Sequence, residues 1–407
     1  MKDKKDKLTI GIFIDSFFPM IDGVIMVVDN SARRLSKYAN VMVFAPVYPG
    51  KEYDDSQLPY KVVRCKAKKM HIIDYSIPMP DLDREFKNTL ENYNLDIVHI
   101  HSPFMIGRLG VKYAAKHNIP SVGTMHSQIL QDFERAVKGK RFAKGLTSVA
   151  VNIYNQCTEC WAVNQDIAYV YHDEYGYKTM PIVIPNATEM KPVNEKRAAK
   201  HIEERHNIKP TDKVFLFVGR LNALKNIFFI VDALKVFKKN NPDIKFKMLY
   251  IGDGQDEEKL RSHIIKQKMS KEVVLVGRIT DRNLLAEYYS RADLFLFPSL
   301  YDTSSLVQIE AASQSTPTLF LEGAVTAGTV TPEVNGILSI NDVDEYARNI
   351  ERMMKDKALY KKIRHNAQKD LYKNRDDIVE YMYKRYLYLI EKKEDDLNSK
   401  LFCKLRT

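Results

Sequence analysis

Short apolar runs alternate with amphipathic helical stretches through the first half of the chain. The apolar runs are rich in β-branched residues and predict buried strands at residues 8–15, 41–46, 96–103, 120–127, 159–164 and 181–187. Apolar residues at helical spacing lie between them, as at residues 24–35 and 107–117. Strands that alternate with helices form βαβ units, so this half predicts a parallel sheet covered by helices.

The same alternation begins again after a polar stretch at residues 186–200. It predicts strands at residues 213–221, 245–254, 273–279, 293–299, 316–322 and 335–340. A final amphipathic segment at residues 376–397 predicts one long helix. We therefore expect an α/β protein of two doubly wound, Rossmann-like domains, at residues 1–190 and 191–375, that face a cleft. A C-terminal helix and tail at residues 376–407 are expected to cross back.

Composition excludes several classes of protein. The chain has 407 residues, of which 45% are apolar and 28% charged, as in a globular protein and unlike a disordered one. Its apolar runs are far shorter than the roughly 20 residues that span a bilayer. The charged start passes directly into the first strand, without an apolar export segment. We expect a cytoplasmic protein.

The charge is positive and locally concentrated. Lysine and arginine number 63 against 52 acidic residues, and neither half carries a polybasic tail that would indicate a nucleic-acid partner. One basic cluster comprises Lys61, Arg64, Lys66, Lys68 and Lys69. A second comprises Arg135, Lys138, Lys140, Arg141 and Lys144. Such clusters attract phosphates or lipid headgroups, although a solvated surface explains them equally well.

The second basic cluster is interleaved with apolar residues. These are Phe133, Val137, Phe142, Leu146 and Val149. The pattern predicts a basic amphipathic helix at residues 133–149, which can lie on an anionic membrane surface. The alternative is an ordinary helix that packs its apolar side inward, and the sequence does not choose between the two.

The candidate chemistry gathers where strands of the second domain end. Asp302 follows the fourth of these strands, and the next helix is expected to begin at Ser304 or Ser305. Free amides at Ser305 and Leu306 would then suit a diphosphate, and Glu310 would reach outward to a ribose diol. The alternative is a strand-end carboxylate beside a helical glutamate in a salt bridge.

Three further strand ends carry cations or glycines. Arg220 and Lys225 follow the first strand of the second domain, where a fork of N–H donors and a point charge suit phosphate oxygens. Gly252 and Gly277 occupy the next two strand-end turns and permit close approach of a ligand. Simple turn formation explains each glycine taken alone.

The order of these motifs resembles a known family. The motifs are VGRL followed by Lys225, then IGDG, VGRI and DTSSLVQIEA. Their order resembles that of the retaining glycosyltransferases of family 4, which have the GT-B fold. DSFFPMIDGV, VHIHSP and GTMHSQ in the first half match as well. Asp302 stands in place of the first glutamate of the family signature, and Ser304 and Ser305 replace Phe-Gly.

The resemblance implies a hexosyltransferase that uses a nucleotide-diphosphate sugar, with UDP-sugar favoured, and neither metal nor cofactor. It implies that Arg220 and Lys225 bind the donor diphosphate, that Glu310 binds the ribose and that Asp302 contacts the sugar. The further donor-side residues that it implies are Gly23, Val24, Gly252, Val276, Gly277, Arg278, Ser304, Ser305 and Leu306.

On the acceptor side, the resemblance places His126, with His101, beside the reacting carbon. The implied acceptor is a hydroxyl of a glycan or glycolipid, and a peripheral position on the inner face of the cell membrane fits such an acceptor. We expect His99, two residues before His101, to face the other side of its sheet. The alternative to an enzyme is a nucleotide-sugar-binding scaffold, which the departures at Asp302 and Ser305 favour.

Overall fold

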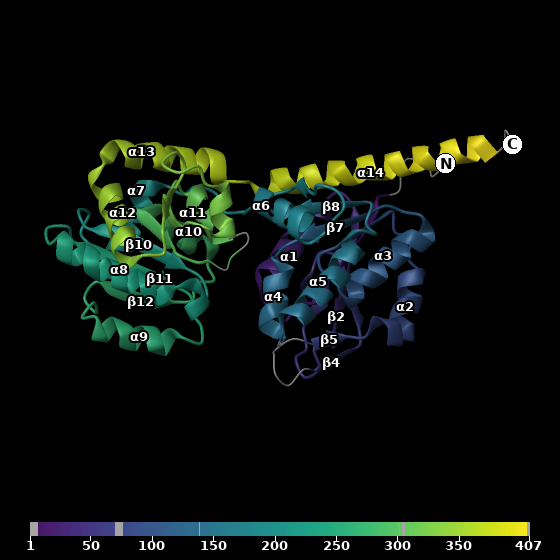
Figure 1. The fold of residues 1–407 in the computed structure, drawn as a ribbon, viewed down its shortest axis with the longest axis horizontal. Coiled ribbons are helices and arrows are strands. Elements are labelled where there is room, and N and C mark those ends of the chain that lie inside the picture. The colour runs from purple at the N-terminus through teal and green to yellow at the C-terminus, as the bar shows by residue number, and fades with distance from the viewer. Residues whose placement is uncertain (1–6, 70–75, 138, 301, 303–305, 405–407) are drawn as a thin grey trace. The chain divides into compact units, whose positions relative to one another are not determined.

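The computed structural model describes residues 7–69, 76–137, 139–300, 302 and 306–404, with side chains to residue 396 (Figure 1). Two compact units divide the chain. The first contains Met1–Asn186 together with Arg375–Thr407, and the second contains Ala187–Asn374. The last helix therefore belongs to the first unit, although it follows the second in the sequence.

The first unit is built on a parallel sheet of seven strands in the order β3-β2-β1-β6-β7-β8-β9. The strands are β1 (Thr9–Phe13), β2 (Asn40–Pro46), β3 (Lys61–Cys65), β6 (Ile97–Ile100), β7 (Ser121–Met125), β8 (Glu159–Ala162) and β9 (Ile182–Val183). The edge strand β3 was not predicted, because its lysine and arginine interrupt the apolar pattern. β4 (Ala67–Lys69) and β5 (Ser76–Pro78) form a separate antiparallel pair.

Helices cover the sheet of the first unit. They are α1 (Gly23–Leu35), α2 (Arg84–Glu91), α3 (Met105–His117), α4 (Ile129–Ala136), α5 (Lys140–Tyr154), α6 (Gln165–Tyr169) and α14 (Arg375–Lys404). Short helical turns are η1 (Asp55–Gln57), η2 (Pro80–Leu82) and η3 (Val170–Glu174). No described helix combines the length and apolar character that crossing a bilayer requires.

The last helix completes the core of the first unit. Val379, Met382, Tyr386 and Leu389 recur every three or four residues, so they share one side of α14 and are buried. They pack with Ile25 of α1 and with the strand residues on the same face of the sheet. Figure 1 shows α14 running along the first unit. This burial explains why the chain returns to the first unit.

The second unit is a parallel sheet of six strands in the order β12-β11-β10-β13-β14-β15. The strands are β10 (Lys213–Val218), β11 (Phe246–Ile251), β12 (Val273–Gly277), β13 (Leu294–Phe297), β14 (Thr318–Leu321) and β15 (Ile337–Ser339). Its helices are α7 (Glu195–His206), α8 (Ile227–Asn240), α9 (Glu257–Lys266), α10 (Arg282–Arg291), α11 (Leu306–Ser313), α12 (Val343–Lys355) and α13 (Lys357–Asn366). Short turns are η4 (Ala223–Lys225), η5 (Val325–Thr329) and η6 (Ala367–Leu371).

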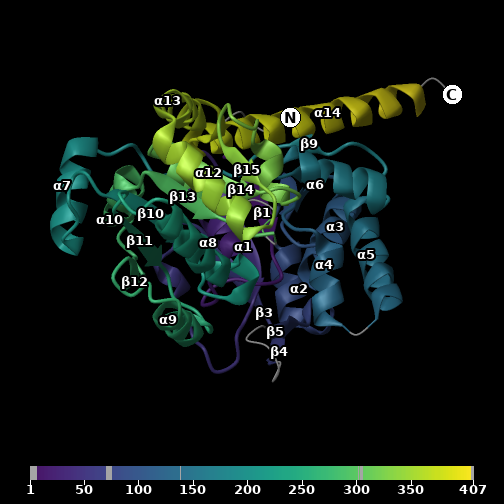
Figure 2. The same ribbon diagram turned by 60° about the vertical axis from the view of Figure 1, so that its left-hand side comes forward.

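Both faces of the second sheet carry a hydrophobic core. One core includes the buried sides of α8, α9 and α12, and the other includes those of α7, α10 and α11. Figure 2 shows α8 and α12 side by side on one face. Helices on both faces of a parallel sheet make each unit doubly wound. The predicted α/β fold with two Rossmann-like domains and a returning helix is confirmed.

The predicted single helix at residues 133–149 is wrong. The structure has two helices, because α4 ends at Ala136 and α5 begins at Lys140. Val137 has an extended backbone, and Gly139 has a φ of 114°, which disfavours any residue with a side chain. The apolar and basic residues therefore lie on two short helices.

Candidate active site

The residues predicted to bind the donor lie at the carboxyl ends of the strands of the second unit, in loops, in the last residues of β12 or on α11. The loops after β10 and β11 hold each other by backbone contacts: the Leu221 amide donates to the Asp253 carbonyl over 2.8 Å. A Cβ on Gly252 would lie 2.0 Å from the carbonyl oxygen of Gly219. Gly252 is thus required by packing between the two loops. This requirement is independent of any ligand.

Lys225 and Asp302 come together at this edge. Lys225 ends η4, whose start is capped by Asn222, since the Asn222 side chain accepts a hydrogen bond from the Lys225 amide. The Lys225 ammonium forms an ion pair with Oδ1 of Asp302, and both side chains are 19% exposed. Within the described part of the chain, Oδ2 of Asp302 is buried without a hydrogen-bond partner. Lys225, predicted to bind the diphosphate, and Asp302, predicted to contact the sugar, are therefore neighbours.

Glu310 is buried on α11 and points toward α10. Its carboxylate accepts a hydrogen bond from Nη2 of Arg282 over 2.6 Å and one from the Tyr289 hydroxyl over 3.1 Å. Burial raises the pKa of Glu310, whereas the charge and hydrogen bonds of Arg282 lower it. In this structure the carboxylate does not reach outward as we expected, because Arg282 and Tyr289 hold it inside.

Arg282 and Tyr289 were missed in the sequence. They are seven residues apart on α10, so they share a side of that helix. That spacing was the available signal, but it says nothing about which carboxylate they meet. Arg282 also contacts Glu189, its Nε lying 3.2 Å from Oε1.

The other donor-side residues of the second unit lie at the same edge. Arg220 follows β10 and is exposed, and Arg278 follows β12 and is also exposed. Val276 and Gly277 are the last residues of β12, and Leu306 is the first residue of α11. Ser304 and Ser305 lie outside the described residues. Arg220 and Arg278 thus extend the cationic character of this edge.

In the first unit, His101 and His126 follow neighbouring strands, β6 and β7. Nδ1 of His101 lies 2.9 Å from Nε2 of His126, so one ring donates a hydrogen bond to the other. The expectation that His99 faces the opposite side is wrong, because residues two apart on a strand share a face. The His99 and His101 rings are 4.1 Å apart between centres. Three histidines therefore form one stack.

Burial keeps this histidine stack neutral. It lowers the pKa of His99 to about 3 and that of His126 to about 4. Burial, followed by the neighbouring His99 and His126, also lowers the pKa of His101 well below its usual range. At neutral pH each ring therefore has one N–H donor and one acceptor nitrogen. The neutral His126 can orient a hydroxyl by hydrogen bonding, but it is not an imidazolium and cannot act as a general acid.

Gly23 and Val24 form the amino-terminal end of α1. Asp22 caps this helix, and its side chain accepts a hydrogen bond from the Ile25 amide over 2.9 Å. Gly23 is exposed, and a Cβ built on it would meet nothing within 4 Å. Val24 is half-buried and packs on the core. The end of α1 is therefore open to a ligand.

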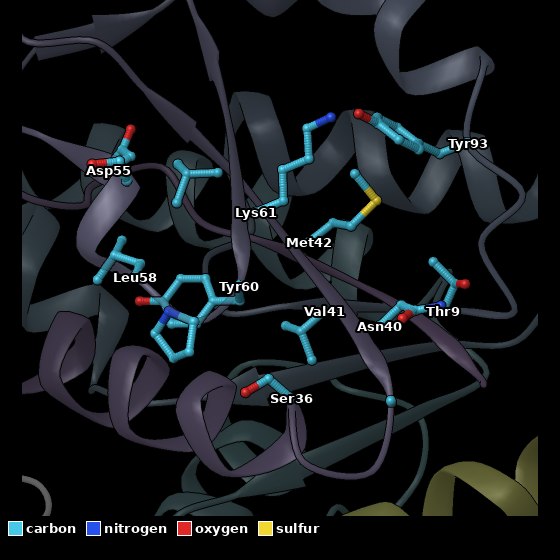
Figure 3. Close-up of a pocket in the computed structure, with 14 residues that line it drawn as sticks. Thr9, Ser36, Asn40, Val41, Met42, Asp55, Leu58, Tyr60, Lys61 and Tyr93 are labelled. Atoms are coloured by element: carbon cyan, nitrogen blue, oxygen red, sulfur yellow. The ribbon is translucent and has the colours of Figure 1, made fainter.

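A separate open groove lies at the other edge of the first sheet (Figure 3). It has a volume of about 810 Å³, and Thr9, Asn40 and Lys61 among its lining residues are the first residues of β1, β2 and β3. Lys61 stands over the Tyr93 ring, with Nζ 5.1 Å from its centre. None of the predicted site residues lines this groove, so it is distinct from the candidate site.

Comparison with known proteins follows this division into two halves. The family described as Glycosyltransferase Family 4 matches residues 21–191, and that described as Glycosyl transferases group 1 matches residues 199–370. The alpha-monoglucosyldiacylglycerol synthase of Acholeplasma laidlawii is 27% identical, covering 97% of this chain and 100% of the relative. The enzyme of the same name from Streptococcus pneumoniae is 25% identical, covering 94% and 92%.

A solved structure shares the fold over nearly the whole chain. It is the crystal structure of Anabaena HepE in complex with UDP, with a TM-score of 0.71 and 16% sequence identity. The similarity covers 96% of this chain and 100% of that one.

Proposed function

Because this chain belongs to the family 4 glycosyltransferases of the GT-B fold, we propose that it transfers a hexose to a lipid hydroxyl. The proposed donor is a nucleotide-diphosphate sugar, with UDP-sugar favoured. The proposed acceptor is diacylglycerol or a glycolipid, and the reaction retains the anomeric configuration without a metal ion. Two relatives that align over nearly the whole chain, both named alpha-monoglucosyldiacylglycerol synthase, support the lipid acceptor.

The observation that carries the donor assignment is the pairing of Lys225 with Asp302. Diphosphate oxygens would replace the Asp302 carboxylate as the partner of Lys225, with Arg220 as a second cation. Asp302 would then accept hydrogen bonds from sugar hydroxyls. These hydroxyls would also satisfy its Oδ2, which is buried without a partner in the described part of the chain.

The remaining donor contacts follow from the same placement. To bind the ribose, the carboxylate of Glu310 would have to turn outward and exchange a contact with Arg282 or Tyr289 for one with the ribose diol. The end of β12, from Val276 to Arg278, would line the base. The leaving phosphate oxygen would take the acceptor proton, and the neutral His126 would orient hydroxyls at the reacting carbon. This proposal needs no side chain as general base.

The surface of α4 and α5 supports a membrane-bound acceptor. We call the following residues the α4–α5 face: Arg135, Lys140, Arg141 and Lys144 with Phe133, Val137, Phe142, Leu146 and Val149. None of these apolar residues is buried, and Phe142 and Val149 are 60% and 63% exposed. α5 packs on its unit through other residues, including Ala143, Thr147 and Ala150. The alternative of an inward apolar side therefore does not describe Phe142 and Val149, whereas Phe133, Val137 and Leu146 are partly buried.

A cationic surface with exposed phenylalanine is suited to an anionic bilayer. Phe104 and Met105, 41% and 42% exposed, extend the apolar part, and the Phe104 ring lies 5.9 Å from that of Phe133. We propose that the enzyme docks peripherally through this face and takes its acceptor from the bilayer.

The test is sugar transfer on vesicles that contain diacylglycerol and phosphatidylglycerol, with UDP-glucose, UDP-galactose and GDP-mannose compared in the presence of EDTA. We expect an α-linked glycosyl lipid from a UDP-sugar. Loss of activity in EDTA would contradict the metal-free reaction, and a β-linked product would contradict retention. Tight UDP binding without transfer or donor hydrolysis across the panel would favour the scaffold instead.

A further inference from the structure

The histidine stack of the first unit is tied to the last helix. Nδ1 of His99 lies 2.6 Å from the hydroxyl of Tyr386 on α14, and Nε2 lies 2.7 Å from Oγ1 of Thr124 on β7. The Tyr386 ring also stacks on Trp161, with 5.4 Å between their centres. Both nitrogens of His99 are therefore occupied, and its ring is fixed from two sides.

His101 has a different environment. It is 4% exposed, and its Nδ1 is hydrogen-bonded to His126. Its Nε2 is buried without a partner among the described residues. His101 and His126 both line a cavity of about 30 Å³. A cavity of this size holds about one water molecule and excludes a sugar. The cavity therefore admits an acceptor to neither ring. His101 is buried and contacts His126, whereas His126 is partly exposed.

We propose that His101 is a positioning residue, which fixes the ring orientation and tautomer of His126, and that Tyr386 of α14 holds His101 in place through His99. The proposal rests on the proposed function only in that His126 faces the reacting carbon. It replaces the acceptor contact that we expected for His101.

Hydrogen-bond chemistry gives the reason. A neutral imidazole has one N–H and one acceptor nitrogen, so a bond between two such rings couples their tautomers. When Nδ1 of His101 donates, Nε2 of His126 accepts and the proton of His126 must sit on Nδ1. When Nε2 of His126 donates, its Nδ1 must be the acceptor. This bond thus couples what His126 presents to a hydroxyl to the tautomer of His101.

The stack determines whether that bond persists. The His101 ring lies between His99, at 4.1 Å between centres, and His126, at 5.2 Å. Without the Tyr386 hydroxyl, His99 loses one of its two hydrogen bonds and can rotate. His101 would then lose the surface that fixes its plane.

The test compares four variants in the full chain. His101→Phe keeps a ring in the stack without the hydrogen bond, whereas His101→Asn places an amide close to the position of Nδ1. Tyr386→Phe removes one hydroxyl, and Tyr381→Phe is its matched control, since Tyr381 lies on the same helix and is 48% exposed. The readouts are the tautomer of His126, by nitrogen-15 NMR, and kcat and KM for transfer to diacylglycerol vesicles.

We expect a single His126 tautomer in the native protein, in His101→Asn and in Tyr381→Phe, and a mixture in His101→Phe and Tyr386→Phe. His101→Phe should lower kcat roughly 10-fold with little change in the donor KM, and His101→Asn should restore most of the loss. Equal losses in the Asn and Phe variants, or an unchanged tautomer in His101→Phe, would overturn the proposal. An inactive native protein would instead refute the proposed function, while the tautomer still decides the role of His101.

Discussion

Lys225 meets Asp302 across the ends of two strands, and this pair has a consequence for the donor. Neither charge is fully solvated, because both side chains are 19% exposed. Removing one member leaves the other partly buried and unpaired, which costs stability. A bound diphosphate supplies Lys225 with a new negative partner, so we expect the donor to separate the pair.

Lys225→Ala tests that role. We expect kcat/KM for the UDP-sugar to fall roughly 10²-fold or more, because one cation is lost where charge develops on the leaving diphosphate. Steady-state transfer assays measure the change. Lys238→Ala is the control. Lys238 on α8 also forms an ion pair, with Glu272 over 2.7 Å, but Glu272 precedes β12 and so lies at the amino ends of the strands. Equal losses in both variants would contradict a specific role for Lys225.

Glu310→Gln tests the proposed ribose contact. The amide keeps the shape of the side chain and can still meet Arg282 and Tyr289, whereas alanine would leave both without their partner. We expect UDP to bind roughly 10-fold more weakly, because a charged hydrogen-bond acceptor is lost. Calorimetric titration measures this change. Unchanged UDP affinity together with an unchanged melting temperature would remove Glu310 from the site.

Local pattern predicted that the candidate residues gather at one edge of the sheet, but it did not predict the partners of their side chains. Asp302, Arg220 and Lys225 were found because each follows an apolar strand, and the ends of parallel strands meet at one edge. The partners of Glu310 on α10 were missed, because tertiary packing decides which side chains meet. The expectation for His99 was wrong for a simpler reason. Side chains two residues apart on a strand point to the same face, so His99 and His101 lie together.

At the scale of elements, Asp15 joins two strand ends of the first unit. It follows β1, and its carboxylate accepts hydrogen bonds from the Ile106 amide over 2.8 Å and the Ser102 hydroxyl over 2.7 Å. A third, of 3.3 Å, comes from the Gly107 amide. These amides lie in the first turn of α3, whose N-cap residue supplies no side-chain hydrogen bond. Asp15 therefore takes the place of a cap.

We expect Asp15→Ala to lower the free energy of unfolding by about 1–3 kcal/mol, because the first turn of α3 loses its acceptor in a partly buried site. Urea denaturation measures the loss. Asp54→Ala is the control, because Asp54 also caps a helical turn, η1, but in an exposed position. A similar loss in both variants would contradict the importance of burial at Asp15.

The α4–α5 face gives a second prediction for an element. We expect Phe142→Ser with Val149→Ser to weaken binding to phosphatidylglycerol vesicles at least about 10-fold, because two exposed apolar anchors are lost. Vesicle flotation at low salt measures the binding. Ile265→Ser on α9 is the control, as Ile265 is equally exposed at 63% but lies in the second unit. Unchanged flotation of the double variant would exclude this face as the docking surface.

The break between α4 and α5 shows what sequence periodicity leaves open. Apolar spacing continued through residues 133–149, so it predicted one helix, while the local signals against it were Gly139 and Gly145. The structure breaks at Gly139 and continues helical through Gly145. A glycine destabilises a helix by about 1 kcal/mol relative to alanine, and tertiary packing decides whether this loss is offset. The outward position of Phe142 was equally undecided, because periodicity defines a side of the helix but not what that side meets.

At the scale of the whole molecule, the last helix joins the chain end to the core of the first unit. Its apolar spacing predicted a long helix, and its return to the first unit agrees with the predicted fold. The contact of Tyr386 with His99 did not follow from either, since the two residues are separated by most of the chain.

The buried histidines make stability depend on pH. The folded-state pKa values of about 3 for His99 and about 4 for His126 are below the ordinary value, so the unfolded chain binds more protons between about pH 6.5 and pH 4. We expect the free energy of unfolding to fall as the pH drops through this window, by up to about 1.4 kcal/mol per pH unit for each histidine.

Fluorescence of Trp161 measures this dependence. It is the one tryptophan of the chain, it belongs to the first unit, and its ring centre lies 5.0 Å from that of His99. Urea midpoints between pH 7.5 and pH 4.5 should fall, and the slope should be smaller in His101→Asn, which has one buried imidazole fewer. A midpoint independent of pH would contradict the neutral, buried stack.

The central claim is that a sugar-bearing diphosphate binds at the carboxyl edge of the second sheet. The most direct measurement is a crystal structure of the protein with UDP-glucose. We predict diphosphate oxygens within hydrogen-bond distance of Lys225 and Arg220, with the Lys225–Asp302 pair separated and Asp302 on the sugar. A donor bound elsewhere, or at this edge with the ion pair intact, would contradict the account.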